Sequence, residues 1–281
     1  MIATYRHAPL VAAALAGISG NVQDLPACQW DLRLGETPVS ARLDDAWLVM
    51  SAPVPAATAR AAMLAWNAGL SGRAKFAISE NGEPHLRAEI PLDEDAEPLI
   101  REAWSGLGMA LALLRGGENR PPAGESEPAV SQDEIQRVCA EVGWPATLRS
   151  DGSCSVELEC PGDFVQASLA PCGAGLRASV PLTNLPESAT ESASAIGLLL
   201  LTTGGVVRLA RPVMEASAGK ALLRLEVAFS ANPSAAHLAH AFAGLSVAHQ
   251  LCAEEARALH DPNLAGEFLA LNNTTTRKVK P

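Results

Sequence analysis

Residues 74–91 read AKFAISENGEPHLRAEIP, and this stretch has the pattern of a β-hairpin. Apolar residues occupy every second position on both sides of a central turn: Ala74, Phe76 and Ile78 before it, and Leu86, Ala88 and Ile90 after it. Such alternation is typical of strands that bury one face. Between them, Asn81-Gly82 supplies the positive φ angles of a tight turn. We therefore predict two antiparallel strands here.

The sequence on either side of this hairpin predicts further strands and helices. Three alternating stretches, at 30–34, 39–43 and 47–52, predict a meander. A helix over 56–68 follows it, opened by Pro55 and closed by Gly69. Helical spacing of apolar residues predicts two more helices, at 8–18 before the meander and at 98–114 after the hairpin. The predicted order is α-β-β-β-α-β-β-α.

The second half of the chain repeats this order. Its helices are opened by the capping residues Ser131 with Glu134, Ser188 with Glu191, and Ser234. Strands are predicted at 156–158, 164–169 and 176–180, and a hairpin at 207–213 and 222–229. Leu86-Arg-Ala-Glu-Ile-Pro is similar to Leu223-Arg-Leu-Glu-Val-Ala. We predict an α+β protein with tandem domains at 1–115 and 131–260, a linker at 116–130, and a C-terminal tail at 261–281.

The charge, the apolar runs and the cysteines of the chain argue against several classes of function and location. The net charge of −10 repels nucleic acid, so we expect no DNA or RNA partner. Apolar runs are too short for a membrane helix, which needs about 20 residues. Residues 8–18 are similar to a weak signal-peptide core, but their helical spacing favours a first helix of the fold. Six cysteines without a Cys-x-x-Cys pair favour free thiols and a cytoplasmic protein.

Four short motifs could carry chemistry, and each has a simpler structural interpretation. Residues 172–178 match a degenerate dinucleotide fingerprint, but Pro181 and the alternation favour a hairpin. Ser217 and Lys220 have Ser-x-x-Lys spacing at a predicted hairpin tip. His237 and His240 share a helix face without a third metal ligand, and the acidic run 93–97 begins a helix, where the dipole favours it. We expect no catalytic, cofactor-binding or metal-binding residue.

The element order, together with residues 67–92, resembles the type III secretion chaperone superfamily and its YbjN-like branch. That resemblance implies a non-enzymatic module that binds a partner protein or peptide and pairs through its middle helix. Two copies in one chain imply a monomer with an internal pseudo-two-fold, in which Met63 and Trp66 face Leu199 and Leu200. These four residues could equally be ordinary core. The alternative function is a ligand-binding protein or enzyme with a site between the copies.

Overall fold

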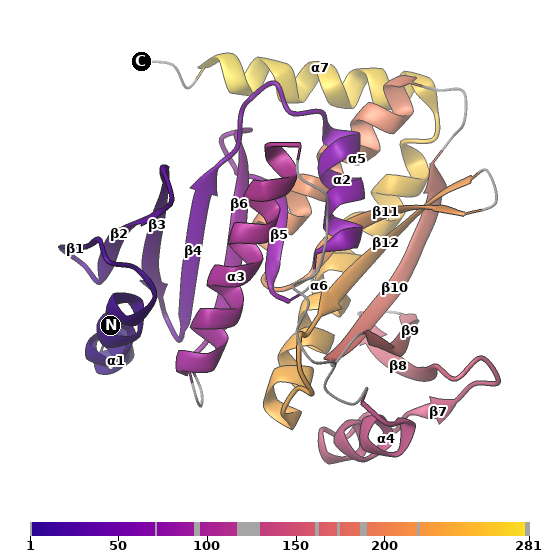
Figure 1. Ribbon diagram of the computed structural model, residues 1–281. Coiled ribbons are helices and arrows are strands. Elements are labelled where there is room, and N and C mark those ends of the chain that lie inside the picture. Colours follow the sequence, from indigo (N-terminus) through magenta and orange to yellow (C-terminus); the bar gives the residue numbers. More distant parts are fainter. Residues whose placement is uncertain are drawn as a thin grey trace.

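The computed structural model describes residues 2–70, 72–92, 96–116, 130–160, 163–172, 175–185, 190–217 and 220–278. Within these ranges the chain forms seven helices and two six-stranded antiparallel sheets (Figure 1). The helices are α1 (Ile2–Ile18), α2 (Arg60–Gly69), α3 (Ala96–Leu114), α4 (Gln132–Glu141), α5 (Thr190–Val206), α6 (Ala235–Ala258) and α7 (Pro262–Lys278). The predicted α+β class is confirmed.

The first sheet has the strand order β1-β2-β3-β4-β6-β5. Its strands are β1 (Val22–Leu25), β2 (Gln29–Leu34), β3 (Thr37–Asp44), β4 (Trp47–Pro53), β5 (Ala74–Ile78) and β6 (Pro84–Pro91). The predicted hairpin is confirmed as β5 and β6, with Ile78 opposite Pro84. Its turn is longer than the expected two residues, and of the Asn81-Gly82 pair only Gly82 takes a positive φ, of 79°.

The second sheet has the order β11-β12-β10-β9-β8-β7. Its strands are β7 (Thr147–Leu148), β8 (Cys154–Cys160), β9 (Asp163–Cys172), β10 (Gly175–Leu185), β11 (Arg211–Ser217) and β12 (Lys220–Ala228). When each half is numbered from its own first strand, the two sheets have the same order. In both, the strand after the middle helix lies at one edge and pairs only with the next strand along the chain.

Each half has one more strand than the sequence predicts. Four strands, rather than three, precede the middle helix, because β1 and β7 lie at the outer edges of their sheets. These strands have four and two residues. β7 is too short to show a period of two, and in β1 the two polar residues are adjacent, so its sequence does not alternate. An edge strand also needs no continuous apolar face.

The cores lie between each sheet and the helices on one of its faces. α1 and α3 pack on the first sheet, and α4 and α6 pack on the second. In β2, for example, Trp30 and Leu32 are buried in this core, while Asp31 and Arg33 are exposed on the opposite face. Burying one large apolar side chain stabilises the fold by about 1.5–3 kcal/mol, so this alternation determines which face the helices cover.

Helix positions differ from the prediction in two places. α2 begins at Arg60, after a turn at Pro55, and not at residue 56. Residues 261–281 were expected to be a polar tail, but 262–278 form α7, which packs against α5 (Figure 1). Asp261 accepts a hydrogen bond from the Asn263 N–H at the start of α7, and Pro262 fits the first helical position.

Most of the predicted linker, residues 117–129, and the predicted capping residue Ser188 lie outside the described residues. The cap formed by Ser131 and Glu134 is confirmed, as is the cap formed by Ser234. Along the part of the chain that the structure describes, no helix combines the length and apolarity needed to cross a bilayer.

Candidate functional site

The two halves meet where each middle helix packs on the other half. α2 contacts β11 and α5, and α5 contacts β5 (Figure 1). A glycine permits this close approach. A Cβ at Gly205 of α5 would lie 2.1 Å from the backbone oxygen of Ile78, too close for any other residue, whereas a Cβ at Gly197 would make an ordinary contact of 3.6 Å with Cβ of Arg60 on α2. We call this region the junction.

The four residues expected between the halves lie on the two middle helices. Met63 and Leu200 are fully buried, and Leu199 is 8% exposed. Trp66 is half-buried, with its ring centroid 5.3 Å from that of Phe76 on β5. The helices that carry these residues pack together.

Lys75 forms the first of two buried charged clusters at the junction. Its side chain is fully buried on β5, and its Nζ lies 2.8 Å from a carboxylate oxygen of Glu89 on β6. Nζ also donates to the backbone oxygens of Val207, at 2.7 Å, and Ala210, at 3.2 Å. These oxygens follow the last turn of α5, so a cation from the first half lies at the C-terminus of a helix in the second, where the helix dipole favours it.

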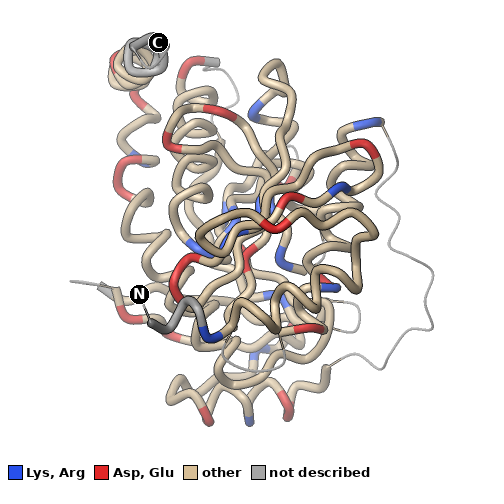
Figure 2. The backbone as a smooth tube through the Cα atoms, turned by 90° about the vertical axis from the view of Figure 1, so that its left-hand side faces the viewer, with Lys and Arg blue, Asp and Glu red and all other residues tan. Residues whose placement is uncertain are grey.

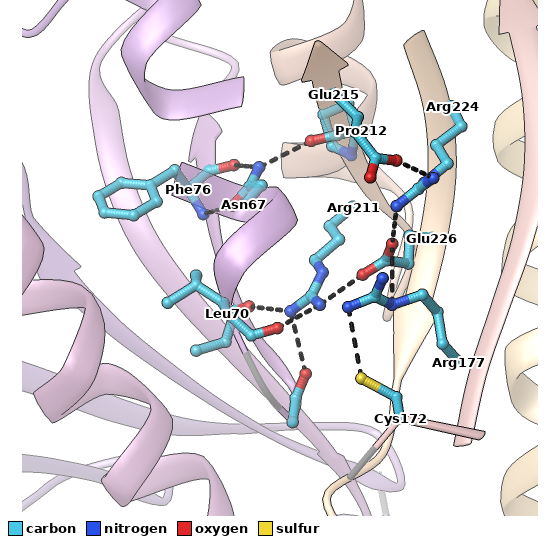
Figure 3. Close-up of polar contacts among 12 residues, drawn as sticks. Asn67, Leu70, Phe76, Cys172, Arg177, Arg211, Pro212, Glu215, Arg224 and Glu226 are labelled. Carbon is cyan, nitrogen blue, oxygen red and sulfur yellow. Dashed lines mark hydrogen bonds and ion pairs between the residues drawn. The ribbon is translucent and has the colours of Figure 1, made fainter. Parts of the chain in front are cut away.

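Arg211 on β11 forms the second cluster, shown in Figure 3. It donates to Oε1 of Glu226 on β12 at 2.6 Å. The same guanidinium donates to the backbone oxygens of Leu70, at 2.5 Å, and of Gly72 and Ala74, both at 3.2 Å. Leu70 is the C-cap residue of α2. A cation of the second half therefore lies at the C-terminus of the middle helix of the first half.

The two clusters are reciprocal. In each, a cation on the edge strand of the junction pairs with a glutamate on the neighbouring strand of its own half and donates to carbonyls of the other half. An arginine two residues before each glutamate adds a further ion pair: Arg87 to Glu89 at 2.6 Å, and Arg224 to Glu226 at 3.2 Å. Figure 2 shows several Lys and Arg positions near the middle of the molecule and others spread around its outside.

The ionisation of the Lys75 cluster follows from its contacts. Burial lowers the pKa of Lys75, and the Glu89 carboxylate opposes that effect. Burial alone would raise the pKa of Glu89, but Lys75, Arg87 and the Leu209 N–H hold it below its ordinary value. The three acceptors around Nζ match the three N–H groups of an ammonium ion. These contacts favour the charged forms of both groups.

Asn67 on α2 joins the two edge strands. Its Nδ2 donates to the backbone oxygens of Phe76 on β5, at 3.0 Å, and Pro212 on β11, at 2.9 Å. Its Oδ1 accepts from the Phe76 N–H at 2.7 Å (Figure 3). One buried amide thus satisfies backbone groups that an edge strand would otherwise leave unpaired.

The contacts of the junction hold the two halves together, and its charged groups are used in these contacts. The side chains of Lys75, Glu89 and Glu226 have no exposed surface, and that of Arg211 is 2% exposed. Their charges are compensated by each other and by carbonyls. A carboxylate or amine must reach a substrate to act as acid or base, and these groups are enclosed by protein.

Open cavities lie on the sheet faces that the core helices leave uncovered. One of about 570 Å³ is lined by residues of β1 to β4 and by His85. A second, of about 680 Å³, adjoins it and includes Arg42, Arg87 and Gly205. In the second half, a cavity of about 710 Å³ lies on the uncovered face of the sheet, and one of about 450 Å³ lies between α6 and β8; both include Trp144 and Glu159.

The short motifs of the sequence lie in structural positions. Cys172 pairs with Gly175 between β9 and β10, so the glycine-rich stretch joins two strands and opens no helix; residues 173 and 174 lie outside the description. Ser217 pairs with Lys220 at the end of the β11–β12 hairpin, as predicted; the turn residues 218 and 219 are likewise not described.

The two histidines of α6 have separate surroundings. His237 is 9% exposed near the start of the helix, and the His240 ring packs edge-on against Trp47, with centroids 5.1 Å apart. Residues 93–95 of the acidic run lie outside the described residues. Glu97 pairs with Arg101 on the surface of α3.

Sequence reasoning missed the charged residues of the junction, although one signal pointed to them. The similar hexapeptides at 86–91 and 223–228 both contain Arg-x-Glu within an apolar strand. A carboxylate there is expected to be paired, because an isolated buried charge is very unfavourable. Lys75 and Arg211 had no such signal, because their partners are carbonyls of the other half.

Comparisons with known proteins give no relative for this chain: no family model, no curated protein and no solved structure matches it.

Proposed function

We propose that this chain is a non-enzymatic protein-binding module, built from two copies of one domain fused as a pseudo-dimer. The observation that carries the proposal is the reciprocal junction. Two sheets of the same strand order each contribute a cation to the end of the other half's middle helix. A symmetric dimer uses the same surface on both subunits, and a fused dimer retains that reciprocity within one chain.

Pairing through the middle helix and a neighbouring strand is what the resemblance to type III secretion chaperones and YbjN-like proteins implies. Here α2 packs on β11 and α5 on β5. The sheet surfaces away from the junction keep open cavities. Such surfaces suit a protein or peptide partner, because extended or helical segments can lie along them.

The junction favours this function over a ligand site between the copies. The buried side chains of Met63, Leu200, Lys75 and Arg211 occupy the space between the middle helices and the edge strands. We further propose that the chain is a monomer that acts in the cytoplasm. The six cysteines, all within the described residues, are free thiols, as expected in a reducing compartment.

Affinity capture of the tagged full chain from its source cells, with quantitative mass spectrometry, tests the function. We expect one protein to be enriched in near-stoichiometric amount relative to an unrelated tagged bait. Enrichment of no protein would count against a binding function. Light scattering on the purified chain should give a mass near 29.2 kDa; twice that mass would contradict the monomer.

A further inference from the structure

The second half exposes apolar side chains that the first half does not. Seven of the eight large exposed apolar residues within the described ranges follow residue 147, and only Leu10 precedes it. Phe164 on β9 is 66% exposed, and Val247 and Leu251 on α6 are 45% and 52% exposed. Contiguous apolar patches are uncommon on monomer surfaces and mark interaction sites.

Val247 lines a groove between α6 and the end of β8, and Leu251 follows one turn later on α6. The groove is about 450 Å³ and is lined by apolar groups: Trp144, Leu158, Cys160, Phe242, Ala243 and Val247. Trp144 is held by an edge-on contact with Phe242, at 5.3 Å between ring centroids. Ala243, Val247 and Leu251 repeat every four residues along α6 and are all exposed. They form a ridge against which a second helix can pack.

Glu159 gives this groove a charge. It lines both the apolar groove and the adjoining cavity of about 710 Å³, and it lies opposite the exposed Phe164 in the strand pairing. Its carboxylate makes no hydrogen bond or ion pair with any residue in the described ranges. Glu254 and Glu255 are also exposed, beyond Leu251 on α6. The groove and the adjoining cavity are lined by Glu157 and Glu159 and by one cation, Arg149, and this acidic balance on a chain of net charge −10 repels a second copy and attracts a basic segment.

We propose that this groove binds an amphipathic helical segment of the partner protein, with apolar residues on one face and Lys or Arg beside them. The apolar face packs along the ridge of α6 and against Trp144, and a basic side chain pairs with Glu159. This inference rests on the proposed function and specifies the partner's chemistry.

Fluorescence polarisation of the full chain with two labelled 18-residue helical peptides tests this binding. One peptide contains Leu and Lys, and the other has Glu at every Lys position. We expect the Leu/Lys peptide to bind at least tenfold more tightly. In the Val247→Ser/Leu251→Ser variant its affinity should fall about tenfold, because two apolar contacts are lost. Both residues are surface-exposed, so the variant is expected to fold, and circular dichroism checks this.

A charge reversal separates a specific site from general stickiness. Glu159→Lys should weaken the binding of the Leu/Lys peptide and strengthen the binding of the Leu/Glu peptide. The matched controls Leu271→Ser, on the exposed side of α7, and Glu97→Lys, on α3, should change neither affinity. Equal affinity for both peptides would overturn the proposal, as would an equal loss of affinity in the control variants. The proposal would also fail if the chain itself formed a concentration-dependent dimer that Val247→Ser/Leu251→Ser abolishes.

The native partner distinguishes this inference from the function on which it rests. If Val247→Ser/Leu251→Ser captures the same protein with unchanged affinity, the groove is not the binding site, and the proposed binding function stands. If the unaltered chain captures no protein, the function itself fails.

Discussion

Replacing Lys75 by methionine removes one charge from the junction while nearly keeping the side-chain volume. Lys75 is fully buried, and the change leaves the Glu89 carboxylate and the carbonyls of Val207 and Ala210 without their donor. Breaking a buried ion pair by removing one partner costs about 3–5 kcal/mol. Glu89 keeps Arg87 and the Leu209 N–H, both at 2.6 Å, so we expect about 3 kcal/mol.

Urea unfolding of the unaltered chain, Lys75→Met, Glu89→Gln and the double variant measures this prediction. The double variant should lose less stability than the sum of the single variants, by roughly 1–3 kcal/mol, because neutralising Glu89 removes the unpaired charge. Arg101→Met breaks the exposed pair with Glu97 and should change stability by less than about 0.5 kcal/mol. A loss below about 1 kcal/mol for Lys75→Met, or strict additivity, would refute the reasoning.

Three further outcomes follow from the junction and the core. Gly205→Val should destabilise the protein by about 2–3 kcal/mol, because a Cβ there lies 2.1 Å from a backbone oxygen. Gly17→Ala, which has open space around it, should not destabilise the protein, and thermal unfolding compares the two variants. Burial raises the pKa of Cys252 to about 12, so a thiol reagent near neutral pH should label it only after unfolding; rapid labelling in the folded state would show that the site is open. The pKa of Glu89 is lowered in the folded protein, so its stabilising contribution is complete above its ordinary pKa of 4.5 and is lost as pH falls through the folded pKa. The stability difference between Glu89→Gln and the unaltered chain should therefore shrink in acid, and a difference that grows would contradict this assignment.

The sequence predicts those parts of the fold whose signals are local. The β5–β6 hairpin and the caps at Ser131 and Ser234 depend on neighbouring residues, and all are present. β7 could not be predicted, because two residues carry no periodicity. α7 was missed because its polar sequence suggested a tail, although Ala265 is fully buried.

The chemistry of the junction lies beyond sequence reasoning for a different reason. Lys75 and Arg211 are stabilised by carbonyls more than 130 positions away in the chain, and a backbone oxygen has no sequence signature. The resemblance to type III secretion chaperones implies that the two middle helices meet. The buried cations at the ends of these helices could not be predicted, because Lys and Arg are usually exposed.

Cleavage between the halves tests the central claim most directly. A protease site placed within residues 117–129 of the full chain would be cut after folding, and light scattering would then measure the mass in native buffer. The reciprocal junction predicts that the two fragments remain together at the mass of the intact chain, about 29 kDa, and separate when Lys75→Met and Arg211→Met are combined. Separation of the unaltered halves upon cleavage would contradict a pseudo-dimer held by this interface.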